Sequence, residues 1–153
     1  MMTKIAIITD THFGVRNDIS HFIEFQNKFF ENTFFPKIDE LNIDTILHLG
    51  DVFDRRKYIN YYTLKECKRF FFDKLKERGI TMYVVIGNHD TYFRNTNEIN
   101  SIQLLLKEYS NIKVLYDPQT IKIKEATICS IPWICENNEQ ACWDEIKNTK
   151  AEI

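Results

Sequence analysis

Long apolar segments, a strong excess of charge of one sign and closely spaced cysteines are all missing from this 153-residue sequence. No apolar run approaches the ~20 residues that a membrane-spanning helix needs, and the first ten residues lack the layout of a signal peptide. These absences argue against a membrane-bound or secreted protein, so we expect a cytoplasmic one. The formal net charge of −2 is not the strongly basic signature of an obvious nucleic-acid-binding protein, but it leaves room for a local basic patch.

The four cysteines do not form a Cys-x-x-Cys pair or another closely spaced metal-binding pattern. They are Cys67, Cys129, Cys135 and Cys142. We expect reduced thiols that are buried as small apolar side chains. Because the chain has no repeat, linker or low-complexity tract, residues 1–153 are expected to form one domain without an internal boundary.

Short apolar runs alternate with amphipathic segments along the first half of the chain. The runs that predict buried strands cover residues 4–9, 44–49 and 81–86. Apolar residues recur at helical intervals over residues 19–41, where Pro36 predicts a kink or break, and over residues 62–78, just before Gly79. Helical crossovers of this length connect parallel strands, so we expect a layered α/β domain.

The second half of the chain predicts shorter elements. Residues 97–109 and 139–147 are expected to form helices. Residues 113–115, 120–124 and 127–131 predict three short strands with a meander-like arrangement.

Each of the three buried strands runs directly into a polar cluster. The clusters cover residues 10–14, 50–55 and 87–90 and contain three of the four glycines of the chain. In an open parallel sheet, ligands bind beyond the carboxyl ends of the strands, so these clusters should meet along one edge. The glycines indicate tight turns or close backbone approach beside a ligand.

Carboxylate, imidazole and amide oxygen are a ligand set suited to Mn²⁺, iron or Zn²⁺ rather than to a thiolate site. Two ions at about 3.5–4 Å from each other need a bridging carboxylate, and Asp51, after the central strand, is the natural candidate. Such a pair activates water and clamps a phosphoryl group. A single cluster could be no more than a turn, but three consecutive ones favour a metal site.

The motifs D-x-H (residues 10–12), G-D-x-x-D-R (50–55) and G-N-H-D (87–90), in this order and after strands, resemble those of the calcineurin-like metallophosphoesterase superfamily. Within it, the T-D-T-H-F-G start and the I-P-W-I-C-E stretch (131–136) resemble the SbcD-type nuclease subunits of double-strand-break repair, including those of bacteriophages. The resemblance extends over essentially the whole chain. It implies an α/β sandwich with a mixed sheet and helices on both faces, incomplete at the C-terminus.

The resemblance also implies a site with two divalent metal ions, most often Mn²⁺. By position, Asp10 and His12 would bind one ion, Asp51 would bridge both, and Asn88 would bind the second through its side-chain oxygen.

His89 would then face the scissile phosphate and stabilise the transition state or protonate the leaving oxygen. A carboxylate near this histidine can fix its tautomer and raise its pKa, and Asp54 is the candidate. Arg55 is a candidate phosphate contact because a guanidinium matches phosphate oxygens bidentately, and a solvated turn arginine is the alternative. Arg94 is a further candidate for substrate binding.

The family's site needs a later metal-binding histidine and then a G-H-x-H loop, and no histidine follows His89 in this sequence. We therefore expect the N-terminal part of a DNA exo/endonuclease, with an incomplete second metal site and weak or absent activity alone. The implied partners are DNA, an SMC-like ATPase subunit and a second copy of the chain, in the cytoplasm of the host cell if the protein is viral.

Two other functions stay open. The G-D-x-x-D-R motif also fits a phosphomonoesterase of the protein-phosphatase type, although Arg56 stands where those enzymes usually carry glycine. The absent later motifs fit a truncated scaffold or binding subunit without activity.

Three further features have simpler explanations. His48 lies within a predicted strand, where a hydrogen-bonded core histidine is expected rather than a ligand. The residues from Arg55 to Tyr62 mix basic and aromatic side chains and could follow a DNA backbone or form an exposed loop. Residues 70–72 are all phenylalanine, and we expect them to divide between core and interface because adjacent helix positions cannot all face one core.

Overall fold

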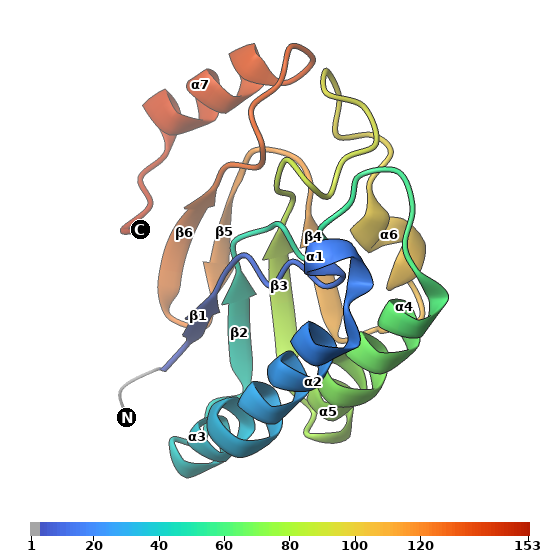
Figure 1. Cartoon of the computed structure of the whole chain (residues 1–153). Helices are drawn as coiled ribbons and strands as arrows, with labels where there is room; N and C mark the ends of the chain where they lie inside the picture. The colour runs from blue at the N-terminus through green and yellow to red at the C-terminus, as the bar shows by residue number, and fades with distance from the viewer. Residues whose placement is uncertain (1–3) are drawn as a thin grey trace.

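A four-stranded parallel sheet forms the centre of the computed structural model, which describes residues 4–153 (Figure 1). Its strands follow the order β1-β2-β3-β4. Their bounds are Ala6–Ile8 for β1, Thr45–His48 for β2, Thr81–Val85 for β3 and Ile112–Leu115 for β4. The three strands that the apolar runs predict are thereby confirmed as parallel neighbours. The strand predicted at residues 113–115 joins this sheet instead of a meander, since β4 pairs in parallel with β3.

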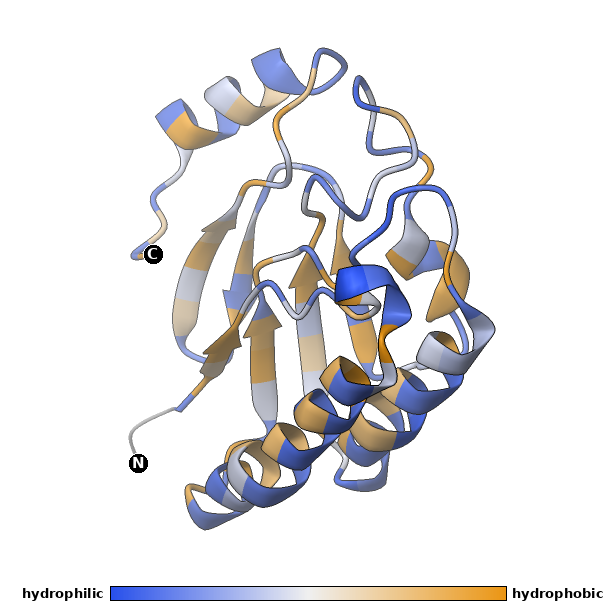
Figure 2. Cartoon of the chain, viewed as in Figure 1, coloured by the Kyte–Doolittle hydropathy of each residue, from blue (hydrophilic) through white to orange (hydrophobic). Residues whose placement is uncertain are grey.

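Two helical crossovers cover one face of the sheet. The first consists of α2 (Ser20–Phe29), the π-helical turn η1 (Phe30–Phe34) and α3 (Phe35–Glu40), and the second of α4 (Tyr61–Cys67), the π-helical turn η2 (Lys68–Phe72) and α5 (Asp73–Glu77). Figure 2 shows mostly hydrophobic strands beside helices that carry both hydrophobic and hydrophilic residues. The row Ala6, Ile46, Met82 and Ile112, which runs across the sheet in register, faces these helices.

The two π-helical turns correct two expectations. Phe70, Phe71 and Phe72 are all buried in the same core, because the wider turn of η2 lets consecutive side chains share it. The prediction that they divide between core and interface is wrong. Pro36 does not end the first crossover: it occupies the first turn of α3, directly after the π-helical turn η1, where a missing N–H is tolerated.

An antiparallel hairpin packs on the other face of the sheet. It pairs β5 (Gln119–Ile123) with β6 (Ala126–Ser130). Ile123 and Ile128 form a second core with Leu47, Val85 and Leu115 of the sheet. The layered α/β class is confirmed. Among residues 4–153, however, the helical crossovers cover only the face opposite the hairpin. The hairpin forms a separate two-stranded sheet, so the parallel sheet is not the expected mixed sheet. Apolar residues alternate along the hairpin and give it one apolar face, which covers the sheet as a layer of helices would.

The remaining elements are short. α1 (Val15–Asp18) is a left-handed turn, α6 (Ser101–Leu105) is shorter than the expected helix over 97–109, and α7 (Glu139–Asn148) matches its prediction. Asn100 caps α6 by accepting the N–H of Gln103, so the residues before it lie outside the helix. No disulfide links the four cysteines, and three of them are buried. Among residues 4–153, no helix is both long and apolar enough to cross a membrane.

Candidate metal centre

The segments that follow β1, β2 and β3 gather at one edge of the sheet (Figure 1). Backbone hydrogen bonds hold the first two side by side, from Asp10 N–H to the carbonyl of Gly50 (3.1 Å) and from His12 N–H to that of Asp51 (3.0 Å). The prediction that the polar clusters meet at the carboxyl ends of the strands is confirmed.

Asp10, His12 and Asp51 each place one ligand atom within 4.8 Å of the others. His12 Nε2 lies 3.3 Å from Asp10 Oδ1 and 3.7 Å from Asp51 Oδ2. A second group of three, on the same distance criterion, consists of His12, Asp54 and His89. The two groups share His12 and form one continuous set of oxygen and nitrogen donors.

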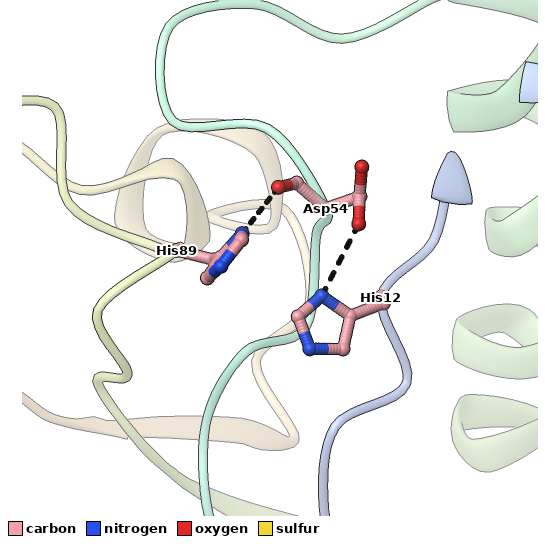
Figure 3. Close-up of side chains that lie close together, drawn as sticks. All are labelled: His12, Asp54 and His89. Atoms are coloured by element: carbon pink, nitrogen blue, oxygen red, sulfur yellow. Dashed lines mark hydrogen bonds and ion pairs between the residues drawn. The ribbon is translucent and has the colours of Figure 1, made fainter. Parts of the chain in front are cut away.

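The donor set fits divalent cations. His12 Nδ1 is buried and has no hydrogen-bond partner, although Asp54 Oδ1 lies 3.4 Å away (Figure 3). Its other ring nitrogen faces two carboxylates. A hydrogen bond from the Thr9 hydroxyl lowers the pKa of Asp10, with His12 as a smaller cause, so Asp10 is a carboxylate at neutral pH. Two carboxylates and the imidazole nitrogen that faces them suit Mn²⁺, iron or Zn²⁺.

Three of these residues have left-handed backbone conformations. The φ angles are 54° at Asp10, 42° at His12 and 55° at Asp51. A residue with a Cβ atom pays about 1–2 kcal/mol for this conformation, which persists only where the surroundings impose it.

Asp90 supplies this constraint at Asp51. Its fully buried carboxylate accepts the backbone N–H groups of Asp51 (2.8 Å), Val52 (2.9 Å), Gly87 (2.9 Å) and Phe53 (3.4 Å). Burial raises the pKa of Asp90 to about 6, against the opposite effect of these N–H groups. One side chain thus ties the loop after β2 to the loop after β3. From the sequence, Asp90 is predicted only as a member of the third polar cluster; its place at the end of G-N-H-D is the signal that could have revealed this role.

Asp54 and His89 meet in a different way from the one expected. His89 Nδ1 bonds to the backbone carbonyl of Asp54, while the carboxylate of Asp54 faces His12 (Figure 3). Because a carbonyl can only accept, Nδ1 of His89 carries the hydrogen and Nε2 is left free. The backbone N–H of His89 donates to Asp51 Oδ1 at 2.9 Å. The expectation that the Asp54 carboxylate fixes the His89 tautomer is therefore corrected, since its main chain does so.

Asn88 lines the same cavity as Asp10 and Asp51. Its backbone carbonyl accepts a hydrogen bond from Arg56 Nε at 2.7 Å, and Arg56 Nη2 donates to Thr91 Oγ1 at 3.2 Å. Arg56, which stands where protein phosphatases usually carry glycine, therefore holds the backbone of the candidate ligand Asn88 in place.

Changing Arg56 to methionine is expected to weaken Mn²⁺ binding roughly tenfold, because residues that orient metal ligands typically contribute this much. Isothermal titration calorimetry of both proteins measures the change. Arg69→Met, which removes an exposed ion pair with Glu66, is the control and should leave the affinity unchanged. Equal affinities for wild type and Arg56→Met would show that Arg56 has no influence on the ligand.

The two candidate substrate arginines lie apart from the donor set. Arg55 donates to Asp18 Oδ2 (2.5 Å) and Asn17 Oδ1 (2.9 Å), so its guanidinium is engaged within the chain rather than free for phosphate. Arg94 is exposed on the loop before α6. In the part of the chain that the structure describes, it forms no hydrogen bond or ion pair with the candidate ligands.

His48 is a hydrogen-bonded core residue, as predicted. It is fully buried, and its Nδ1 accepts the Gly50 N–H at 3.1 Å. Nε2 therefore carries the hydrogen and donates to Thr11 Oγ1 at 3.1 Å, and the Thr11 hydroxyl donates to the carbonyl of Val52. This chain of bonds connects the first two loops of the site.

Burial lowers the pKa of His48 to about 4, below the ordinary value of 6.5. A neutral imidazole in the folded state stabilises the protein above pH 6.5, and this contribution is lost as the pH falls through 4. Between pH 8 and pH 4, urea unfolding in EDTA should show a loss of about 3 kcal/mol in wild type relative to His48→Asn, which does not titrate. The raised pKa of Asp90 makes the protein more stable as the pH falls over the same range, opposite to the effect of His48. Both proteins contain Asp90, so its contribution cancels in the comparison. Parallel pH profiles would contradict the assignment.

Comparisons with known proteins agree with the motifs. The family model described as calcineurin-like phosphoesterase matches residues 3–151. The chain is 32% identical to exonuclease subunit 1 of Enterobacteria phage T4 over 97% of this chain and 43% of the relative. It is 35% identical to the DNA double-strand break repair protein Mre11 of Sulfurisphaera tokodaii (84% and 33% covered) and 30% identical to that of Methanocaldococcus jannaschii (95% and 38%). The chain thus spans less than half the length of these relatives.

Among solved structures, a protein of unknown function from Aquifex aeolicus matches 80% of this chain and 56% of its own, at 24% identity and a TM-score of 0.41. That likeness is too weak to support an argument about function.

Proposed function

The chain belongs to the calcineurin-like phosphoesterase family, and on that premise we propose that it forms one side of a two-metal, Mn²⁺-dependent site that hydrolyses phosphodiester bonds in DNA. The observation that carries the proposal is the convergence of Asp10, His12 and Asp51 around shared space, where Nε2 of His12 faces both carboxylates. The names of the relatives, an exonuclease subunit and double-strand break repair proteins, point to DNA as the substrate and to recombination and repair as the process.

In this proposal Asp10 and His12 would hold one ion, Asp51 would contribute to both, and Asn88 would hold the second. The ions would neutralise charge on the phosphodiester and lower the pKa of the attacking water. The carboxylate of Asp54, 3.4 Å from His12 Nδ1, would orient the ring from the side opposite to Nε2. Asp10, His12 and Asp51 already have their left-handed backbone conformations in the folded chain. Binding of the ions would therefore require little further ordering of the chain.

His89 is the proposed proton donor. The Asp54 carbonyl fixes Nδ1–H, and the free Nε2 is the atom that exchanges a proton. When Nε2 is protonated, it can donate to a phosphate oxygen in the transition state and then transfer the proton to the leaving oxygen. The Asp51 carboxylate helps to fix the position of His89 because it accepts the backbone N–H of His89.

DNA would approach over the loop between Arg55 and α4. Tyr58 in this loop and Tyr61 at the start of α4 are exposed, and Lys57 Nζ lies 5.7 Å from the ring centre of Tyr92. Cationic and aromatic side chains of this kind bind nucleic-acid backbones and bases. Arg94 is proposed to contribute from the next loop. We also propose an SMC-like ATPase subunit and a second copy of the chain as partners, in the cytoplasm.

The test is hydrolysis of linear duplex DNA, bis(p-nitrophenyl) phosphate and a phosphoserine peptide, each with Mn²⁺ and with EDTA. Turnover of DNA and of the small phosphodiester only with Mn²⁺ supports the proposal. Activity confined to the phosphoserine peptide would favour a phosphomonoesterase instead. If no substrate turns over and Mn²⁺ does not bind, the proposal fails and a binding or scaffold subunit is favoured.

A further inference from the structure

A cavity of about 440 Å³ lies beside the candidate metal ligands. Asp10, Asp51 and Asn88 contribute to its wall, and so do Leu49, Trp133 and Ile134. Ligand atoms for cations and a large aromatic surface therefore share one cavity. The metal site accounts for the first set of residues and leaves the second without a role.

Trp133 has a fixed main chain and a partly exposed side chain. Its N–H donates to the carbonyl of Ile86 at 2.8 Å, directly after β3. Its carbonyl accepts the side-chain amides of Asn97 (3.1 Å) and Asn138 (3.0 Å). The residue nevertheless keeps 40% of its surface exposed. Two distant segments and the start of α7 thus hold the backbone of a tryptophan whose ring lies outside both hydrophobic cores.

The second tryptophan gives a useful contrast. Trp143 is similarly exposed, at 47%, but it lies on α7 and does not line the cavity. An exposed aromatic residue on the surface of a helix needs no special explanation. Trp133 differs because it lines the same cavity as the candidate ligands.

We propose that Trp133 stacks on an unpaired nucleobase next to the phosphate that Asp10, Asp51 and Asn88 engage. This inference rests on the proposed function and narrows its substrate to single-stranded or frayed DNA. A nucleotide joins an anionic phosphate to an aromatic base, which matches the two kinds of surface in the cavity. Stacking on an aromatic side chain tolerates any base, because each has a π face, and requires that the base leave its duplex partner.

The binding experiment uses fluorescence. In a Trp143→Phe background, where Trp133 is the only tryptophan, a short oligothymidylate should quench the emission saturably in the presence of Mn²⁺. An abasic deoxyribose-phosphate oligomer of the same length should bind without quenching. Trp133→Leu should weaken oligothymidylate binding at least about fivefold, as measured by anisotropy with a labelled oligomer, and leave the affinities for the abasic oligomer and for Mn²⁺ unchanged. Trp133→Phe keeps an aromatic ring, so its affinity for oligothymidylate should lie between those of the Trp143→Phe parent and Trp133→Leu.

The outcomes separate the inference from the proposal on which it rests. If Mn²⁺ and the abasic oligomer bind but oligothymidylate neither quenches Trp133 nor binds more tightly, the stacking site is refuted and the phosphodiesterase proposal stands. If the chain binds neither Mn²⁺ nor any oligomer, the proposed function fails and the stacking site fails with it. Thermal unfolding of each variant, followed by circular dichroism, shows whether a loss of binding comes from a loss of fold.

Discussion

Replacing Asp90 with alanine is expected to lower the free energy of unfolding by at least about 3 kcal/mol and to abolish measurable Mn²⁺ binding. The carboxylate accepts four backbone N–H groups while fully buried, and each buried N–H that loses its partner costs about 1–3 kcal/mol. The loop of Asp51 would lose the contacts that hold its left-handed backbone. Urea unfolding and calorimetric titration measure the two effects.

Two further variants sharpen this prediction. Asp117→Ala removes an exposed carboxylate and should change stability by no more than about 0.5 kcal/mol. Asp90→Asn keeps one acceptor oxygen but turns an NH₂ group toward N–H donors. Its loss in free energy of unfolding should therefore lie between the losses of Asp90→Ala and Asp117→Ala. If Asp90→Ala is as stable as wild type, the carboxylate does not hold the two loops together.

Replacing Gly87 with alanine is expected to reduce Mn²⁺ affinity at least about tenfold. A Cβ atom at this position would lie 2.2 Å from Asp51 Oδ1 and 2.4 Å from Asp51 N, so the proposed bridging carboxylate would have to move. The backbone conformation of Gly87 is open to alanine, because its φ does not fall in the left-handed region. Any loss therefore comes from displacement of Asp51 and not from strain at residue 87.

Gly79 provides the matched control for this substitution. It has a φ of +66° and no heavy atom within 4 Å of an added Cβ. Gly79→Ala should thus cost about 1–2 kcal/mol of stability through backbone strain and leave Mn²⁺ affinity unchanged. The reverse pattern, with metal binding lost in Gly79→Ala and kept in Gly87→Ala, would contradict the packing described around Asp51.

The sequence was sufficient for the features that depend on local pattern. Apolar runs and helical periodicity place β1 to β3 and the two crossovers, and parallel strands necessarily bring residues 10–14, 50–55 and 87–90 to one edge. The meeting of Asp10, His12 and Asp51 followed from that rule alone. Their roles as ligands remain a proposal.

Features that depend on packing between distant segments could not be predicted in the same way. The three adjacent phenylalanines share one core because of a π-helical turn, which periodicity at 3.6 residues per turn does not anticipate. The hairpin replaces the second helix layer because its apolar face matches Leu47, Val85 and Leu115. Asp54 was expected near His89 and lies there, but which of its oxygens faces the histidine depends on the path of the loop.

The central claim is that three strand-end loops build a site for divalent metal ions around Asp51. Its most direct test is calorimetric titration of Mn²⁺ into wild type and Asp51→Asn, whose amide oxygen can still accept the His89 N–H. We predict saturable binding to wild type and its loss in Asp51→Asn, with the fold of the variant intact by circular dichroism. Equal binding by the two proteins, or no saturable binding by wild type, would contradict the claim.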